Sequence, residues 1–333
     1  MANDFHLFEP DENRVHEFDS LMRLRLTETL RHIHETADGC LNISDSLLNS
    51  GINRILEKPI LADTFAAYYE LVHAIYDDNL DLATQLFEEV LTAPACGQLE
   101  LIPYLGKEDA RSNRYINTID TDPDLPFAIT PVSKTDFDQA SKLIHQSYTF
   151  LKECDPALHA ELSALLRSIV IGSGSTVKKA RTFDGASAFE IWGAIVLNAI
   201  EAKDIVDMVQ TLTHESSHVM LFGYCIDDQL VLNPDSERYA SPLRQDPRPI
   251  DGIYHAVFIL ARMFYASTVL CESDQLDTTL KEKADNTRRR FAKRFYDGLG
   301  TLNEHARYTE IGKNLMDAAE SYMDQKAFHL ILT

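Results

Sequence analysis

The sequence has few of the features that mark several large protein classes. Its five cysteines are scattered and form no C-x-x-C pair, which predicts reduced, mostly buried thiols and no disulfide framework. No apolar run reaches membrane-spanning length, and the first residues lack the basic and apolar parts of a secretory signal. We therefore expect a cytoplasmic protein that does not bind a membrane.

Basic residues are in the minority, with 31 Lys and Arg against 52 Asp and Glu, which gives a net charge of −21. Such a surface repels nucleic acid, so a nucleic-acid enzyme is not expected, whereas a basic peptide would be tolerated. The 333 residues suffice for one large domain or two modest ones, and 45% hydrophobic residues are normal for a soluble globular protein. Nothing in the sequence defines an oligomeric state.

The most informative segment is the pentad His214-Glu215-Ser216-Ser217-His218, an H-E-x-x-H motif. Residues four apart lie on one face of a helix, so the two imidazoles would aim at a common metal ion with Glu215 beside it. The flanking sequence predicts that helix, with Asp204 as its N-cap, Gly223 just past its end and apolar residues at helical spacing. The alternative is a pair of surface histidines without a ligand.

The remaining pattern predicts an α+β protein that is mostly α-helical, with a small β-sheet beside the HExxH helix, and not a cupin barrel. We expect a mainly helical N-terminal region with an irregular connection, 1–136, and a metal-binding catalytic region, 137–333, packed as one unit. Within these regions the pattern predicts helices in 12–93, 137–167, 249–271, 277–297 and 311–327, an irregular segment at 94–136, and strands at 168–172 and 189–197.

Two histidines rarely complete a metal site, so a third protein ligand is expected. The extended metzincin pattern is absent, because Leu221 and Tyr224 stand where it needs Gly and His. His255 is the better candidate, because it lies in an apolar run where an imidazole needs a partner. A core histidine bonded to backbone is the alternative for His255, and Glu237 and Glu272 are weaker candidates for the third ligand.

A second motif follows the pentad. The run S-P-L-R-Q-D-P-R-P at residues 241–249, then Gly252 and His255, resembles the HEXXH-motif domain family of peptide-modifying enzymes. That family is found beside genes for ribosomally made, modified peptides. The resemblance covers roughly residues 165–270, and the pairing of an HExxH helix with this loop is more specific than either part.

The resemblance implies a peptide hydroxylase that depends on iron(II), 2-oxoglutarate and O₂, and that oxidises the β-carbon of a residue in a precursor peptide. It implies His214, His218 and His255 as iron ligands, with Glu215 orienting a ligand or the peptide. Arg244 and Arg248 match the loop arginines, and either could pair with a carboxylate of 2-oxoglutarate. Arg262 is a reserve candidate for that role. Anchoring of the loop through Asp246 is the alternative role for the two loop arginines.

A zinc metallopeptidase of the HExxH type is the alternative interpretation of the same residues. The usual iron oxygenase triad has two histidines and a carboxylate, whereas three histidines suit zinc as well. In that case Glu215 would take a proton from the attacking water. In the hydroxylase reading, the strand predicted near 189–196 could bind an extended peptide along its edge. A binding module without catalysis has no support, because the pentad is intact.

Overall fold

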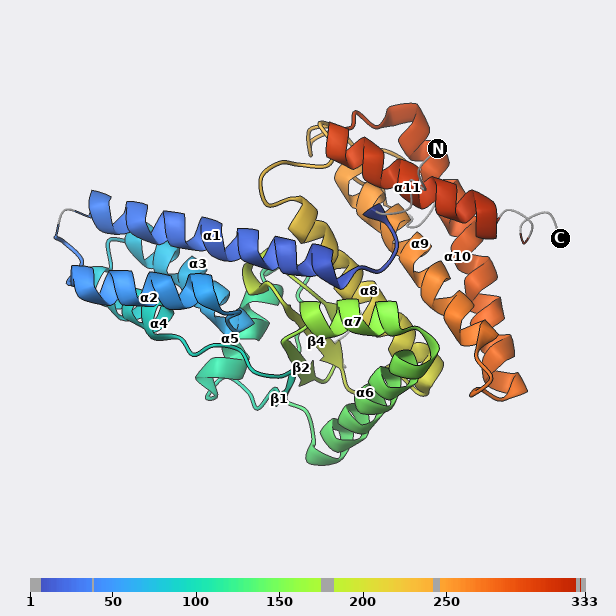
Figure 1. The fold of residues 1–333 in the computed structure, drawn as a ribbon, viewed down its shortest axis with the longest axis horizontal. Coiled ribbons are helices and arrows are strands. Elements are labelled where there is room, and N and C mark those ends of the chain that lie inside the picture. Colours follow the sequence, from blue (N-terminus) through green and yellow to red (C-terminus); the bar gives the residue numbers. More distant parts are fainter. Residues whose placement is uncertain (1–6, 38, 175–182, 242–245, 328–329, 331–333) are drawn as a thin grey trace. The chain divides into compact units, whose positions relative to one another are not determined.

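A computed structural model of the protein describes residues 7–37, 39–174, 183–241, 246–327 and 330. Helices dominate, and four strands form one small open sheet, which confirms a mostly helical α+β fold that is not a closed barrel (Figure 1). The chain forms two compact units. Unit 1 comprises residues 1–11, 143–162 and 202–333, and unit 2 comprises residues 12–142 and 163–201. The boundary near residue 136 stays a prediction.

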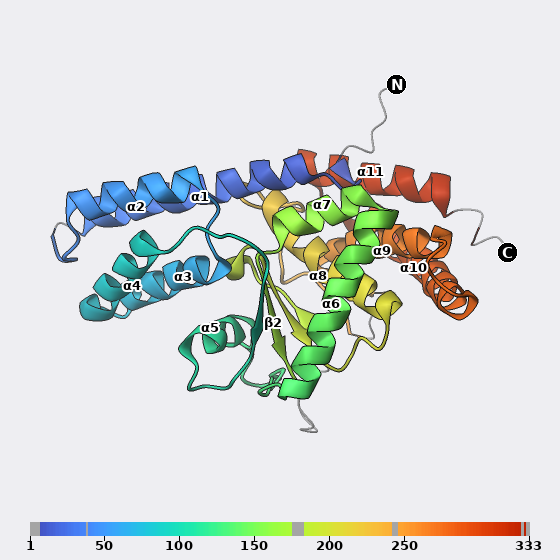
Figure 2. The same cartoon turned by 60° about the horizontal axis from the view of Figure 1, so that its bottom comes forward.

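Unit 2 begins with the helices predicted for residues 12–93. They are α1 (Glu12–Thr36), α2 (Asp45–Glu57), α3 (Ala62–Tyr76) and α4 (Leu80–Thr92). Local capping defines two of their starts, because Ser44 accepts from the backbone N–H of Leu47 and Asn79 from that of Leu82. Figure 2 shows α1 and α2 side by side, with α3 and α4 packed together next to them.

The sheet of unit 2 has the strand order β1-β2-β4-β3. Its strands are β1 (Glu100–Pro103), β2 (Ser168–Gly172), β3 (Gly185–Ala186) and β4 (Ala194–Asn198). The pairs β1–β2 and β2–β4 are parallel, and β3 is antiparallel to β4. Every residue of β2 and β4 is buried, as expected of parallel strands that are covered on both faces. The strand predicted at 168–172 is confirmed.

The strand predicted at 189–197 is only partly correct. Phe189–Ile191 forms a 3₁₀ turn, and Gly193 has a φ of +85°, so the extended segment starts at Ala194. β4 then lies between β2 and β3. The prediction that this strand offers a free edge to a peptide is therefore wrong.

The segment predicted as irregular, residues 94–136, contains two regular elements. β1 pairs with β2, and α5 (Ala110–Ile119) begins at Asp109, whose side chain accepts from the backbone N–H of Ser112 at 2.8 Å. The prediction of an irregular connection is wrong for these residues. β1 has only four residues, and pairing with a strand far along the chain stabilises it, so local composition did not reveal it.

A buried charge network ties α1 to the rest of unit 2. Asp19 is 3% exposed, and its carboxylate accepts from Trp192 Nε1 at 3.2 Å and from Arg23 Nε at 2.9 Å. Arg167 forms an ion pair with the same carboxylate, and its Nη1 donates to the carbonyl of Ile60 at 3.1 Å. Because buried charges are stable only when paired, these groups depend on one another.

Unit 1 contains the helix with the pentad and the helices that follow it. They are α8 (Ile205–Tyr224), α9 (Ile250–Glu272), α10 (Thr278–His305) and α11 (Glu310–Lys326). Residues 143–162 of the unit come from α6 (Lys134–Cys154) and α7 (Pro156–Leu165), which confirms helix across most of 137–167. The helices predicted at 277–297 and 311–327 are confirmed, and the first of them extends to His305.

α9 is the central helix of unit 1 and packs against α8, α10 and α11 (Figure 1). By length and composition it could cross a membrane, whereas the sequence pattern predicted no such segment. Most of it is buried inside the unit, which is how the core helix of a soluble protein behaves.

At the first turn of α11, Gly312 lies so close to Leu230 that a Cβ would be 1.9 Å from its carbonyl oxygen.

Replacement of Asp19 tests the buried network. In Asp19→Ala, Arg167 and Trp192 Nε1 lose a partner in a dry environment, so we expect the free energy of unfolding to fall by about 3–5 kcal/mol. The exposed Asp45, which lies 3.0 Å from His34 Nε2, is the matched control, and Asp45→Ala should lower it by less than about 1 kcal/mol. Urea unfolding followed by fluorescence of the single tryptophan measures both. Equal losses in the two variants would contradict a special role for the network.

Candidate metal centre

The pentad lies well inside a capped helix. Asp204 is the N-cap of α8, as predicted, and its side chain accepts from the backbone N–H groups of Val206 and Asp207 at 3.0 and 3.1 Å. The predicted helix end is wrong by two residues, because Gly223 is still helical and Cys225 is the C-cap. The helix places His214 and His218 one turn apart, with their ring centroids separated by 5.2 Å.

The third imidazole comes from the first turns of α9. Pro249 is the N-cap of α9, one position before the helical position predicted for it. The ring of His255 lies 5.9 Å from that of His218 and 6.4 Å from that of Phe222, centroid to centroid. Packing of α8 against α9 thus brings together three histidines, of which the first and the last are 41 positions apart in the sequence.

The spacing of the rings can be compared with that of imidazoles around one ion. Two imidazoles that bind an ion at about 2.1 Å, about 109° apart, have centroids about 5 Å from each other. The observed 5.2 and 5.9 Å are close to this value. Among the residues that the structure describes, no three His, Cys, Asp or Glu side chains are placed so that they could hold a metal ion. The fit to a metal therefore rests on the three imidazole donors and on the spacing of their rings, and not on a ready-made arrangement of their nitrogens.

Desolvation favours the neutral form of two of the imidazoles. Burial, together with the neighbouring His214 and His255, holds the pKa of His218 well below its usual value. Burial also lowers the pKa of His255, and the carboxylate of Asp251, whose Oδ1 lies 3.7 Å from His255 Nε2, opposes that shift. A metal binds the neutral form of imidazole, so the surroundings of both rings favour the ligand form.

Glu215 occupies the position that an HExxH site reserves for a carboxylate. It is 5% exposed, and its Oε1 lies 3.9 Å from His214 Nε2. The hydroxyls of Ser216 and Ser217 instead donate to the carbonyl of Thr213 within the helix. Glu215 is therefore the one carboxylate of the pentad, and it is buried beside His214.

The three arginines predicted to bind a diacid differ in their contacts and in whether the structure describes them. Arg244 lies outside the described residues. Arg248 is 38% exposed, and its Nε lies 2.9 Å from Oδ2 of Asp246, an ion pair without hydrogen-bond alignment. Its backbone pairs with that of Tyr239 in both directions, at 2.8 and 2.9 Å. This pairing with Asp246 is the contact that the loop-anchoring alternative expects, and the Nε atom that makes it is buried although the side chain as a whole is partly exposed.

Arg262 has a structural role in unit 1. It is 2% exposed, it forms an ion pair with the fully buried Glu161, and its Nη1 donates to the carbonyl of Phe8 at 2.9 Å. Glu161 also accepts from the backbone N–H of Asp11 at 3.0 Å. These contacts tie the N-terminal segment and α7 to α9, so this guanidinium is already occupied and not available for a diacid in this structure.

Sequence reasoning missed two neighbours of the histidines. Asp251 precedes His255 by one helical turn, and that i, i+4 spacing could have revealed it. Met263 lies on α9, and its Sδ is 3.3 Å from Nδ1 of His214 on α8. No local pattern in the sequence signals a contact between these two side chains.

Cys225 is a poor candidate for a metal ligand. It follows α8 directly, and burial, reinforced by the carboxylates of Asp251 and Asp228, raises the pKa of its thiol to about 12. A metal binds the thiolate, so a protonated sulfur is a poor donor.

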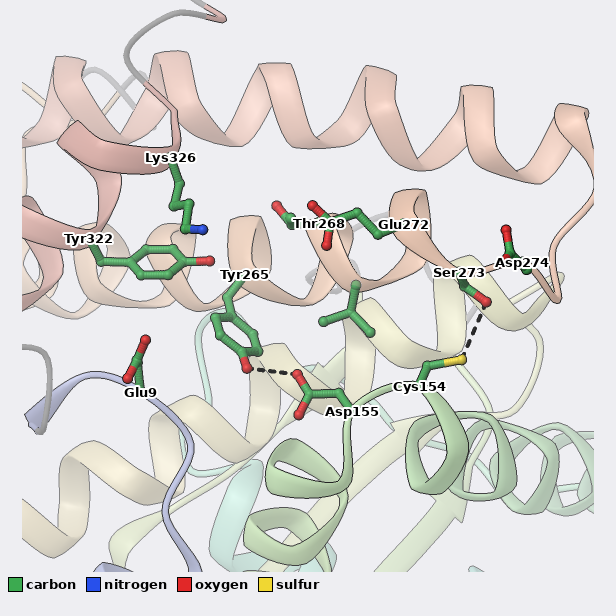
Figure 3. Close-up of a pocket in the computed structure, with 11 residues that line it drawn as sticks. Glu9, Cys154, Asp155, Tyr265, Thr268, Glu272, Ser273, Asp274, Tyr322 and Lys326 are labelled. Atoms are coloured by element: carbon green, nitrogen blue, oxygen red, sulfur yellow. Dashed lines mark hydrogen bonds between the residues drawn. The ribbon is translucent and has the colours of Figure 1, made fainter.

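A cavity of about 490 Å³ in the same unit is not part of this centre (Figure 3). Tyr265 donates to Asp155 across it at 2.7 Å, and Glu9, Glu272 and Asp274 add further carboxylates, against one lysine, Lys326. An acidic lining repels a dianion. The cavity contains none of the three histidines, and its acidic lining, which includes the weaker ligand candidate Glu272, does not suit 2-oxoglutarate.

Neither models of known protein families nor curated proteins gave a match to the chain.

Loss of a histidine tests the metal centre. We expect the protein to bind one Co²⁺ per chain, and His255→Ala or His218→Ala to weaken that binding by at least about a hundredfold, because two imidazoles hold an ion far less well than three. The exposed His16 on α1 is the control, and His16→Ala should bind like the parent. Titration followed by visible absorbance measures the affinity. Tight binding that survives His255→Ala would exclude this residue as a ligand.

Replacement of Arg262 separates a structural role from a cosubstrate role. Arg262→Met leaves the buried Glu161 unpaired, so we expect the free energy of unfolding to fall by about 3–5 kcal/mol. Replacing both partners, Arg262→Met with Glu161→Leu, should recover much of the loss, because no charge is left buried alone. Chemical denaturation measures both variants. An Arg262→Met protein of normal stability that needs more 2-oxoglutarate would restore the cosubstrate role.

Proposed function

We propose that the protein is an iron(II)- and 2-oxoglutarate-dependent oxygenase that hydroxylates the β-carbon of a residue in a ribosomally made peptide. The observation that carries the proposal is the cluster of His214, His218 and His255, whose ring spacing fits one ion. The choice of this chemistry over other metal chemistry rests on the resemblance of residues 241–255 to the loop of the peptide-modifying family.

The chain's own groups have distinct tasks in this proposal. His214, His218 and His255 would hold iron(II), which supplies the oxidative chemistry together with 2-oxoglutarate and O₂ when bound. Three neutral imidazoles leave the full positive charge of the ion uncompensated, and this favours binding of a dianionic cosubstrate. Glu215, buried beside His214, would accept a hydrogen bond from a ligand or from the peptide amide and so orient it.

Arg248 is the described residue best suited to the cosubstrate carboxylate. It is partly exposed, and its partner Asp246 has a side chain 64% exposed. Exposed ion pairs contribute little to stability, so exchanging Asp246 for a carboxylate of 2-oxoglutarate would cost little. A guanidinium that binds a carboxylate through two parallel N–H groups adds direction as well as charge.

A zinc metallopeptidase is the second candidate. The observation that favours it is Glu215, which is buried and whose Oε1 lies 3.9 Å from Nε2 of His214. Glu215 has the position of the proton-accepting carboxylate in an HExxH peptidase. In that reading Glu215 would accept a proton from the water that attacks a peptide carbonyl. Both candidates use the same three imidazoles, so metal binding alone does not separate them.

The remaining parts of the proposal concern setting and partners. We propose a cytoplasmic enzyme whose partner is a precursor peptide, with no role for nucleic acid or a membrane. The acidic chain, at −21, suits a peptide with basic residues better than a polyanion.

Turnover separates the two candidates. Protein purified without oxygen receives iron(II), 2-oxoglutarate and a set of synthetic peptides that together present every residue type, and air is then admitted. We expect succinate and a peptide heavier by one oxygen atom. Mass spectrometry measures both products. Peptide cleavage with zinc alone, without succinate, would identify the peptidase instead.

Two variants sharpen this experiment. Glu215→Gln should abolish a peptidase but leave a hydroxylase measurable activity, because only the peptidase needs a proton acceptor there. Arg248→Ala should raise the 2-oxoglutarate concentration at half-maximal rate by about 10- to 100-fold, since a charge-assisted hydrogen bond is lost. Arg238→Ala, in the same loop and exposed, is the control and should leave it unchanged. An unchanged requirement in Arg248→Ala would remove Arg248 from the cosubstrate site.

A further inference from the structure

One side chain outside the pentad contacts a candidate ligand directly. The thioether sulfur of Met263 lies 3.3 Å from Nδ1 of His214. A thioether carries no hydrogen and can only accept, so a hydrogen bond at this distance requires the proton to be on Nδ1. In a neutral imidazole with the proton on Nδ1, the lone pair is on Nε2.

We propose that Met263 is a positioning residue that holds His214 in the Nδ1–H tautomer and so leaves Nε2 unprotonated for a metal. The inference rests on the proposed metal centre for its purpose, but the contact and the tautomer can be measured in the metal-free protein. It goes beyond the three ligands by naming what fixes one of them.

His214 has a more exposed side chain than His255, at 41% against 16%. An exposed imidazole without a directed contact can carry its proton on either nitrogen. The sulfur of Met263 at Nδ1 of His214 is a directed contact, and it favours the tautomer with the proton on Nδ1.

The contact also links the two helices that carry the ligands. Met263 follows His255 by eight residues on α9, about two turns, while His214 is on α8. A fixed distance between Met263 and His214 therefore fixes the exposed end of the pentad relative to the helix that supplies the third imidazole. His255 has a neighbour of a different kind, since Oδ1 of Asp251 lies 3.7 Å from its Nε2.

The strength of the effect follows from the acceptor. Carboxylate and carbonyl partners of metal-binding histidines typically change metal affinity by about 10- to 100-fold when they are removed. Sulfur is a weaker acceptor than these oxygens, so we expect about a three- to tenfold effect from Met263. Leucine matches methionine in volume and lacks the acceptor, which makes it the informative replacement.

The first experiment is nitrogen NMR of the metal-free protein with ¹⁵N-labelled histidine, at a pH where the imidazoles are neutral. The signals of His214 are assigned by their loss in His214→Ala. We expect the Nδ1–H tautomer in the parent, a shift toward Nε2–H in Met263→Leu, and a return toward Nδ1–H in Met263→Gln, whose amide oxygen can accept. An Nε2–H tautomer in the parent, or the same tautomer in the parent and in Met263→Leu, overturns the inference.

The second experiment is titration of the same proteins with Co²⁺. Met263→Leu should bind three- to tenfold more weakly than the parent, and Met263→Gln should recover part of the loss. Met316→Leu, a buried methionine on α11, is the matched control and should bind like the parent. Equal affinity in Met263→Leu and the parent overturns the positioning role. If the parent binds no Co²⁺ while the tautomer still depends on Met263, the metal centre fails and the tautomer-holding contact stands.

Discussion

The arrangement of the candidate centre depends on the packing of α8 against α9. α8 by itself can present two imidazoles and one carboxylate, because residues four apart share a face. The third imidazole belongs to a helix that begins 32 positions after His218, and only the contact between the helices brings His255 within 5.9 Å of His218. The same interface contributes Met263 to His214. A change that shifted one helix along the other would therefore alter a ligand and its support together.

Burial explains why these helices can hold polar groups. α9 is so apolar that it resembles a membrane-spanning segment, yet it carries His255 near its start and Arg262 farther along. Arg262 is stabilised by Glu161 and by the carbonyl of Phe8, so its charge is paired inside the unit. His255 is stabilised differently, because desolvation favours its neutral form. α9 thus carries a paired charge, on Arg262, that stabilises the unit, and a neutral imidazole, on His255, that suits a metal.

Two buried carboxylates have comparable structural roles in the two units. Asp19 in unit 2 joins Trp192, Arg23 and Arg167, and Glu161 in unit 1 joins Arg262 to the N-terminal segment. In both cases one acidic group connects chain segments that are more than a hundred positions apart. In a chain with 52 acidic residues, Asp19 and Glu161 have this role because they are buried and paired with arginines.

The sequence by itself determined the features that depend on near neighbours. It revealed the pentad helix with its Asp204 cap, the helices of residues 12–93, the strand at 168–172 and the mostly helical class, because helical periodicity and capping are local. It did not reveal β1 or the turn before β4, since distant strand pairing and a positive φ at Gly193 decided them.

The tertiary structure alone decided which distant side chains meet. It placed His255 beside the pentad, as the sequence had suggested. It paired Arg262 with Glu161, although helical spacing had made this arginine a candidate for binding a diacid. It also brought Met263 to His214. Spacing along a helix says which residues share a face, and only packing says what that face contacts.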